Sequence, residues 1–447
     1  MKSKITTCLW ICLLAVSEAA MAQDKNIEHY FADLLAGSTN SYTQDKIIKP
    51  AQIKMWQDKV WAAWKQANRQ AKEEKLIAAK PLDKWSKGSW TLPDSLEPHA
   101  VMPYCYWKKA DSTQTGRLPL FLYLHGSGPK EQEWYAGVRL STMFKDAPSI
   151  YFIPQIPNEG NYYRWWQKAK QYAWEKLIRL ALAGEDVDAN RLYVFGISEG
   201  GYGSQRLASF YADYLAAAGP MAGGEPLRNA PVENCANIGF SFLTGELDNG
   251  FYRNYFTKAT RQWFDSLQVR HPGLYDHRIE LVPNCGHAID YRPTTPWLRQ
   301  HVRNPYPKQV FWEDFEMDGR HRNGFYNIYV NERPDKADNT RTYYEMSIQG
   351  DTINVKVSTV TYDILQRDPN WGIEMKFKKS YKPATSGKFT IYLNEQLVDL
   401  KVPVTVIVNG KQVFQGKVKA NVKNMVNSCA TFFDPYRIYP AAVEIKL

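Results

Sequence analysis

The chain has few cysteines and no long apolar run after its first residues. Six cysteines occur among 447 residues and none forms a Cys-x-x-Cys pair, which argues against a structural zinc site. The formal net charge of +10 comes from scattered Lys and Arg, without a dense basic run. We therefore expect no metal, no cofactor, no membrane insertion and no nucleic-acid partner.

The start of the chain has the order of an export signal. Lys2 and Lys4 precede an apolar stretch from Ile5 to Val16 that is too short to span a bilayer. Ala20-Met21-Ala22 then fits a small-residue cleavage site. We expect residues 1–22 to be a signal peptide and the mature protein to be periplasmic or secreted. A buried N-terminal helix is the alternative.

Four cysteines follow that segment, and export would place them in an oxidising compartment. Their spacing does not choose among the three possible pairings. We expect Cys235 and Cys285 to form a disulfide, because each lies near a strand end in the last part of the expected sheet. Such a bridge would hold the loop that follows Cys285. Two free thiols are the alternative.

The mature chain divides into three regions. Residues 23–87 form an N-terminal helical segment, with helical periodicity over 27–80. Its apolar face carries Trp56, Val60, Trp64, Ala67 and Ala71 at helical spacing, and we expect this face to pack on the main domain. A ligand-binding stripe of tryptophans is the alternative.

Residues 88–303 alternate between strand and helix patterns. Leu118 to Leu124 is a continuous apolar run, as expected of a strand covered on both faces. The alternation predicts an α/β fold, with a mostly parallel sheet between layers of helices. Further strands are expected at 100–107, 149–153, 191–195, 214–218, 238–243 and 278–282, and helices at 172–182 and 252–269.

Beyond the prolines of residues 293–307 helical periodicity disappears. Residues 308–447 alternate in short strands and predict an all-β domain, a sandwich. Asn409-Gly410 between two strands is the dipeptide that a type I′ hairpin turn prefers. Other strands are expected at 325–330, 342–348, 352–361, 372–377 and 388–393.

The most informative motif lies at Gly196-Ile197-Ser198-Glu199-Gly200, between an apolar strand and a helical stretch. A sharp strand-to-helix turn strains its central residue and leaves room only for small neighbours two positions away. The two glycines meet that need. Ser198 is therefore expected to be an exposed nucleophile.

A nucleophilic serine requires a base, and the base requires a carboxylate to orient it. His287 follows the last expected parallel strand, at the sheet edge where such folds place active sites. Asp248 follows the preceding strand and is the expected acid, with Glu246 in reserve. Asp290 is too close in sequence to His287 to be favoured.

Residues 88–303 resemble the α/β-hydrolase family, whose catalytic residues follow the order serine, acid, histidine. Tyr123-Leu124-His125-Gly126-Ser127-Gly128-Pro129 is similar to the family's turn that supplies an oxyanion-hole amide. The resemblance implies that the backbone amides of Ser127 and Glu199 bind the oxyanion. Glu199 departs from the family pattern at the position after the serine. The segments look most like secreted polyester- and feruloyl-esterase-type enzymes and their oligopeptidase-like relatives.

Aromatic residues are dense between Asn158 and Trp174. We expect Tyr163, Trp165 and Trp166 to bind substrate, because this segment follows a strand and should overhang the active-site edge. Packing of a lid onto the domain is the alternative.

These patterns predict an exported serine hydrolase that cleaves carboxylic esters, acting on acyl groups of a polysaccharide or on small esters. A serine peptidase, a polyester or lipid esterase and a catalytically silent carbohydrate-binding protein are the alternatives. The sequence leaves the oligomeric state and the role of the C-terminal domain open.

Overall fold

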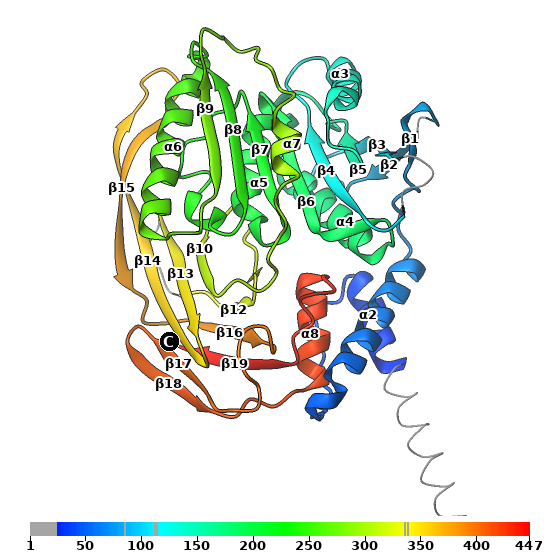
Figure 1. The fold of residues 1–447 in the computed structure, drawn as a ribbon, viewed down its shortest axis with the longest axis vertical. Helices are drawn as coiled ribbons and strands as arrows, with labels where there is room; N and C mark the ends of the chain where they lie inside the picture. The colour runs from blue at the N-terminus through cyan, green and yellow to red at the C-terminus, as the bar shows by residue number, and fades with distance from the viewer. Residues whose placement is uncertain (1–24, 85, 111–114, 335–336, 338) are drawn as a thin grey trace, which may run out of the picture. The chain divides into compact units, whose positions relative to one another are not determined.

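A computed structural model describes residues 25–84, 86–110, 115–334, 337 and 339–447 (Figure 1). The expected signal peptide lies outside the described residues, as do Cys8 and Cys12. The described residues form two compact units, the first made of Lys25–Glu73, Tyr392–Asn394 and Val418–Val443, the second of Glu74–Ile391, Glu395–Lys417 and Glu444–Leu447. Over the described ranges, no helix combines the length and the apolar character needed to cross a membrane.

The second unit contains a nine-stranded sheet in the order β1-β3-β5-β4-β6-β7-β8-β9, with β2 paired to β3. From β5 to β9 all neighbours are parallel, whereas β3 is antiparallel to β5. The α/β fold expected from the sequence is confirmed. The strands are β1 (Lys80–Pro81), β2 (Lys87–Thr91), β3 (Val101–Lys109), β4 (Leu118–Leu124), β5 (Ser149–Pro154), β6 (Val187–Ile197), β7 (Ala217–Met221), β8 (Gly239–Gly245) and β9 (His277–Val282).

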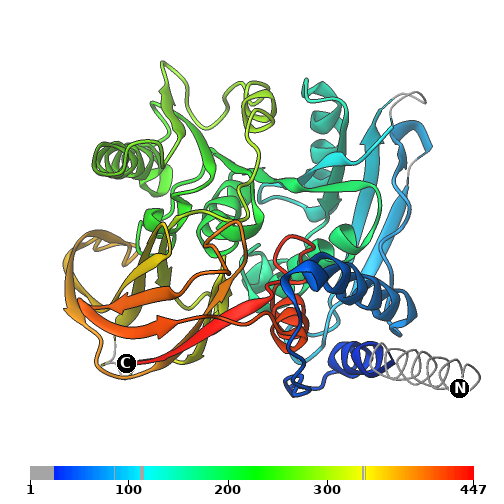
Figure 2. The same ribbon diagram turned by 60° about the horizontal axis from the view of Figure 1, so that its bottom comes forward.

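Helices cover both faces of this sheet (Figures 1 and 2). Successive side chains of β4 point to opposite faces, because strands have a two-residue period. Phe121 and Tyr123 pack with residues of α3 and α7, and Leu120 and Leu122 face α4 and α5. We call this sheet with its helices the α/β domain. Its helices are α3 (Lys130–Met143), α4 (Lys168–Ala183), α5 (Glu199–Phe210), α6 (Arg253–Arg270) and α7 (Thr294–Leu298).

The later strands form two further sheets, β10-β13-β14-β17-β18 with β15 on β14, and β11-β12-β16-β19. Asn409 and Gly410 have φ of 48° and 80° between the paired residues Val408 and Lys411, which confirms the two-residue hairpin turn. We call residues 309–391, 395–417 and 444–447 of the second unit the β-domain; the last residues of β16 and the first residues of β19 belong to the first unit. The strands are β10 (Gln309–Asp314), β11 (Gly324–Phe325), β12 (Ile328–Glu332), β13 (Thr340–Gln349), β14 (Thr352–Arg367), β15 (Glu374–Pro383), β16 (Lys388–Leu393), β17 (Val404–Val408), β18 (Lys411–Gly416) and β19 (Ala441–Lys446).

The prediction that residues 308–447 are all-β is wrong at α8 (Val422–Phe432), which belongs to the first unit. Within that unit α8 packs against α2 (Ile53–Gln70). The predicted apolar face of α2 is buried, with Trp64 only 1% exposed. The helical prediction over 27–80 holds for 25–35 and α2 but fails between them and after Gln70. Asn421 caps α8 by accepting a hydrogen bond from the Lys423 amide, a local signal that sequence reasoning missed.

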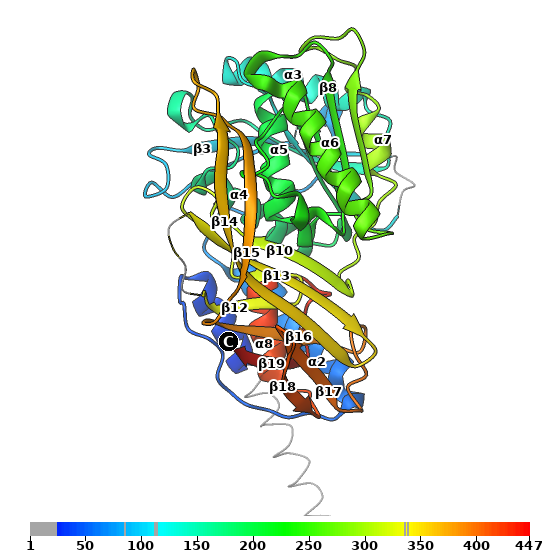
Figure 3. The same cartoon turned by 90° about the vertical axis from the view of Figure 1, so that its left-hand side faces the viewer.

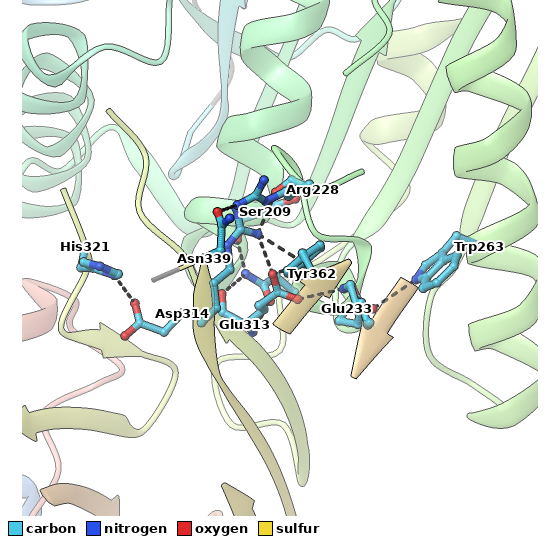
Figure 4. A network of polar contacts seen from close by, with 12 residues as sticks. Ser209, Arg228, Glu233, Trp263, Glu313, Asp314, His321, Asn339 and Tyr362 are labelled. Atoms are coloured by element: carbon cyan, nitrogen blue, oxygen red, sulfur yellow. Dashed lines mark hydrogen bonds and ion pairs between the residues drawn. The ribbon is translucent and has the colours of Figure 1, made fainter. Parts of the chain in front are cut away.

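The β-domain contacts the α/β domain through buried charges (Figure 4). Glu313 of β10 accepts hydrogen bonds from Arg341 at 2.6 Å and Lys379 at 2.8 Å. Lys379 also donates to Glu233 of the α/β domain at 2.8 Å. Burial by itself would raise the pKa of Glu313. The charges and hydrogen bonds of its partners, chiefly Lys379 and Arg341, outweigh that effect and lower the pKa to about 2. The carboxylate is therefore ionised and fully neutralised inside the interface.

The expected disulfide between Cys235 and Cys285 is wrong, because all four cysteines of the described residues are free thiols. Cys235 is buried, with its sulfur 3.9 Å from the Ser209 hydroxyl of α5. Burial raises the pKa of this thiol to about 12, so it is inert. Cys285 is half-buried in the loop after β9. The two cysteines lie near strand ends, as the sequence indicated, but their side chains do not meet.

Candidate active site

The turn from β6 to α5 holds Ser198 in a strained backbone conformation, with φ of 57° and ψ of −116°. A Cβ at Gly196 would lie 2.5 Å from the carbonyl oxygen of Gly200, and one at Gly200 would lie 1.9 Å from that of Leu124. Only glycine fits at these two positions. The strand-to-helix turn expected from the motif is present, with Ser198 at its tip.

The structure brings Ser198, His287 and Asp248 together from three separate loops. The Ser198 hydroxyl oxygen lies 3.0 Å from Nε2 of His287, and Nδ1 of His287 lies 2.7 Å from Oδ2 of Asp248. Asp248 follows β8 and is 3% exposed, whereas His287 follows β9 with its side chain 44% exposed. Hydrogen bonds link the serine to the imidazole and the imidazole to the carboxylate, an arrangement that can activate the serine hydroxyl as a nucleophile.

Arg253, at the start of α6, holds Asp248 from the other side. Its Nε donates to both carboxylate oxygens, at 2.9 and 3.0 Å. Burial raises the pKa of Asp248, but the hydrogen bonds from Arg253 and His287 lower it below its ordinary value. Sequence reasoning missed this arginine, although its place one helical turn after the acid was visible.

The reserve acids have other partners. Glu246 is exposed and accepts a hydrogen bond from the Asn284 amide at 3.1 Å. Asp290 pairs with Arg292 at 2.8 Å. Asp248 is therefore the carboxylate that contacts the imidazole.

No family model matches the chain. Feruloyl esterase B of Neurospora crassa is 26% identical over 183 residues, which cover 37% of this chain and 61% of that protein. The chain thus spans about three fifths of the length of this curated relative. A solved thermostable esterase is 22% identical over 49% of this chain and 64% of its own, with a TM-score of 0.39. A ferulic acid esterase of Anaeromyces mucronatus is 13% identical over 51% and 91%, with a TM-score of 0.35.

The structure combines a mostly parallel sheet, a strained turn at the serine and the chain order serine, acid, histidine. This combination is typical of α/β-hydrolases. The chain has an α/β-hydrolase fold. Its catalytic candidates lie at the carboxyl ends of β6, β8 and β9, the edge where parallel sheets bind ligands.

The turn after β4 is oriented by buried side chains. The carbonyl oxygen of Gly126 accepts hydrogen bonds from the Tyr163 hydroxyl and from His125 Nδ1, both at 2.8 Å. In a trans peptide the following N–H points opposite to that carbonyl. The Ser127 amide is therefore directed away from Tyr163 and His125, and Ser127 lines the same cavity as Ser198. The Glu199 amide opens α5, where first-turn N–H groups are free of helix bonds.

His125 supports the turn after β4. Its Nε2 accepts the Ile156 amide at 3.1 Å, so Nδ1 carries the proton that Gly126 accepts. Burial lowers the pKa of His125 to about 4, which keeps the ring neutral. The imidazole is fully buried, so it orients the turn without reaching a substrate.

The expectation that Tyr163 and Trp165 bind substrate is wrong. Trp165 is 0% exposed and donates to the carbonyl of His125 at 2.9 Å, and Tyr163 is 6% exposed. Both hold the turn after β4, as in the lid-packing alternative. Trp166 does line the cavity, with the Arg206 guanidinium 3.9 Å from its ring centre.

A cavity of about 700 Å³ begins at Ser198 and reaches the β-domain. Its wall includes Arg341 of β13, Arg367 of β14 and the turn before β15. Phe251, another wall residue, lies with its ring 4.9 Å from that of the exposed Trp371. The aromatic rim expected from the sequence is therefore built in part from another loop and another domain. Among the described residues, no group of His, Cys, Asp or Glu could hold a metal ion.

Glu199 points into this cavity beside the nucleophile. Burial raises the pKa of its carboxyl to about 7, although the charge of Arg164 lowers it and that of Glu225 raises it. Its Oε2 lies 3.4 Å from the Arg164 guanidinium. A neutral or paired Glu199 removes most of the repulsion that an acid next to an oxyanion would cause.

Replacing Glu199 with glutamine is expected to stabilise the fold at high pH. Because the pKa of Glu199 is higher in the folded chain than in the unfolded chain, its contribution to folding is lost as the pH rises from 4.5 through about 7. A glutamine does not ionise. The free energy of unfolding of Glu199→Gln, relative to that of the wild type, should therefore increase by on the order of 2–3 kcal/mol between about pH 5 and about pH 8. Denaturant unfolding at both pH values measures this difference. The exposed Glu246→Gln is the matched control, and an equal response of both variants would contradict the prediction.

Proposed function

We propose that this hydrolase is an exported serine esterase that removes acyl groups from a polysaccharide through an acyl-enzyme. The observation that carries the proposal is the pair of hydrogen-bonding distances, 3.0 Å from Ser198 to His287 and 2.7 Å from His287 to Asp248. The cavity next to Ser198 provides room for a sugar or a phenolic acyl group.

In the proposed mechanism, the Ser198 oxygen attacks the ester carbonyl carbon while Nε2 of His287 takes the hydroxyl proton. The amides of Ser127 and Glu199 stabilise the oxyanion. His287 then protonates the leaving alcohol, and the C–O bond of the ester breaks. Water, deprotonated by His287, attacks the acyl-enzyme and releases the carboxylic acid and free Ser198. Asp248 keeps the proton on Nδ1 throughout.

The test of this function uses a panel of substrates: acetyl, feruloyl and methyl esters, and peptides. The name of the curated relative motivates the feruloyl esters. Hydrolysis of esters, abolished by Ser198→Ala, supports the proposal. Cleavage of peptides but not of esters would replace it with the peptidase alternative.

The leader-like residues 1–22 support export of this hydrolase. N-terminal sequencing of the protein recovered from the periplasm or medium of an expressing bacterium tests this part. Cleavage before Gln23 is the expected result, and a cytoplasmic protein that keeps Met1 contradicts it.

Asp248→Asn is expected to lower kcat by roughly a thousandfold or more, because an asparagine would stabilise the wrong imidazole tautomer. Glu246→Gln should change kcat less than about threefold, since Glu246 contacts the Asn284 amide. Initial rates on 4-nitrophenyl acetate compare the two variants. A larger loss in Glu246→Gln would reassign the acid.

A further inference from the structure

The far wall of the active-site cavity is a hairpin of the β-domain. Figure 3 shows β14 and β15 rising as a long pair next to the helices of the hydrolase sheet. The Tyr252 hydroxyl donates to Asp368 at 2.6 Å, and the Tyr255 hydroxyl to the carbonyl of Met375 at 3.3 Å. These contacts hold the end of the hairpin beside the loop that carries Asp248. The β-domain therefore contributes to the shape of the cavity.

Arginine dominates the charged residues of this wall. Two of the arginines, Arg228 and Arg367, donate to the same Oε1 atom of Glu374, each at 2.8 Å. One carboxylate thus neutralises two guanidinium groups. The lining arginines are Arg164, Arg206, Arg228, Arg253, Arg341 and Arg367, and the lining acids are Glu199, Glu225 and Glu374.

Two buried carboxylates behind the wall, Asp248 and Glu313, pair with Arg253 and Arg341. Asp368, next to Arg367 in the hairpin, is a third buried carboxylate, so six arginines face six carboxylates in the wall and behind it. Lys379 and Glu233, next to Glu313, cancel each other. The surface that a ligand would contact nevertheless carries six arginines and only three acids, a composition that favours an anionic ligand.

Arg367 is the accessible member of the shared pair. Its side chain is 54% exposed, against 19% for Arg228. It donates to Glu374 and to the carbonyl of Gly372. A guanidinium has five N–H donors, so Arg367 retains donors that can bind a carboxylate.

Exposed aromatic rings lie near this arginine. Phe251 is 51% exposed and Trp371 is 62% exposed, and their rings are in edge contact. Trp371 lies four residues after Arg367, in the turn between β14 and β15. Aromatic faces bind the apolar faces of sugar rings, and a guanidinium binds a carboxylate. Together they match the chemistry of an acidic sugar.

We infer that the substrate is an acylated acidic glycan, in which a uronate carboxylate binds Arg367 beside Phe251 and Trp371 while the ester reaches Ser198. This inference rests on the proposed esterase function and specifies its substrate class. Arg367 is a specificity residue here and takes no part in the covalent steps.

The test compares two glycosides that differ only at C5 of the sugar. Methyl tri-O-acetyl-glucopyranosiduronate carries a carboxylate there, and methyl tri-O-acetyl-xylopyranoside carries hydrogen. We expect kcat/KM for acetate release to be roughly tenfold higher for the uronate, mainly through KM, as expected for one charge-assisted hydrogen-bonded pair. Arg367→Gln should remove most of this preference, and added salt should weaken it. The matched control, Arg261→Gln, removes an exposed arginine of α6 that does not line the cavity, and should keep the preference.

Equal kcat/KM for the two glycosides, or an equal loss on both in Arg367→Gln, would overturn the inference. The 6-sulfate of methyl tri-O-acetyl-glucopyranoside is a third substrate, and a higher kcat/KM for it than for the uronate would overturn the carboxylate assignment. Ser198-dependent hydrolysis without a uronate preference removes only this inference. No hydrolysis of any of these esters or of 4-nitrophenyl acetate would overturn the proposed function as well.

Discussion

Ser198→Ala is expected to lower kcat on 4-nitrophenyl acetate by at least roughly a thousandfold, because the acyl-enzyme cannot form without the hydroxyl. The melting temperature should remain close to that of the wild type, since alanine and serine tolerate the φ of 57° at this position about equally. A fluorophosphonate probe should label Ser198 in the wild type and leave the variant unlabelled.

Ser127→Ala is the matched control, because Ser127 is proposed to act through its backbone amide, which alanine retains. Its kcat should stay within about threefold of the wild type. Labelling of another serine, or an equal loss in both variants, would contradict the assignment of the nucleophile.

Truncation after Arg303 is expected to give an insoluble or strongly destabilised protein. It removes Arg322, which pairs with the fully buried Asp213 at 2.5 and 3.0 Å, and Lys379, which pairs with the buried Glu233. The truncation also uncovers apolar surface of the α/β domain, such as Phe210, whose ring lies 5.4 Å from that of Phe315. Newly exposed apolar surface of this kind favours aggregation. Solubility and thermal unfolding of the truncated chain measure the effect. A soluble fragment with full esterase activity would identify the β-domain as a detachable module.

Arg322→Met tests the same interface in the full-length chain. It removes the guanidinium that donates to both carboxylate oxygens of the buried Asp213 and should cost about 3–5 kcal/mol. Arg261→Gln, which breaks an exposed pair at 3.9 Å, should cost less than about 1 kcal/mol. Similar unfolding midpoints for the two variants would show that the buried pairs contribute little.

The sequence by itself determined the α/β sheet and the positions of Ser198, Asp248 and His287 along it. The strand Leu118–Leu124 agrees with its predicted bounds, because a strand buried on both faces is a local apolar run. The two glycines around Ser198 are a local steric requirement. The acid and the base could be placed because parallel strands deliver their following loops to one edge. The hairpin at Asn409-Gly410 was predictable for the same local reason.

Only the tertiary structure decided which side chains meet across the chain. The sequence predicts that Tyr163 and Trp165 lie at the surface. They are buried instead and donate hydrogen bonds to the carbonyl oxygens of Gly126 and His125 in the turn after β4. Arg164 pairs with Glu199, and Lys379 pairs with Glu233, although the partners are far apart in sequence. Arg367 likewise lines the same cavity as the distant Ser198. Cys235 and Cys285 remain free thiols, although each lies near the start or end of a predicted strand. Periodicity and turn motifs carry information about neighbours a few residues away, whereas these contacts depend on how whole elements pack.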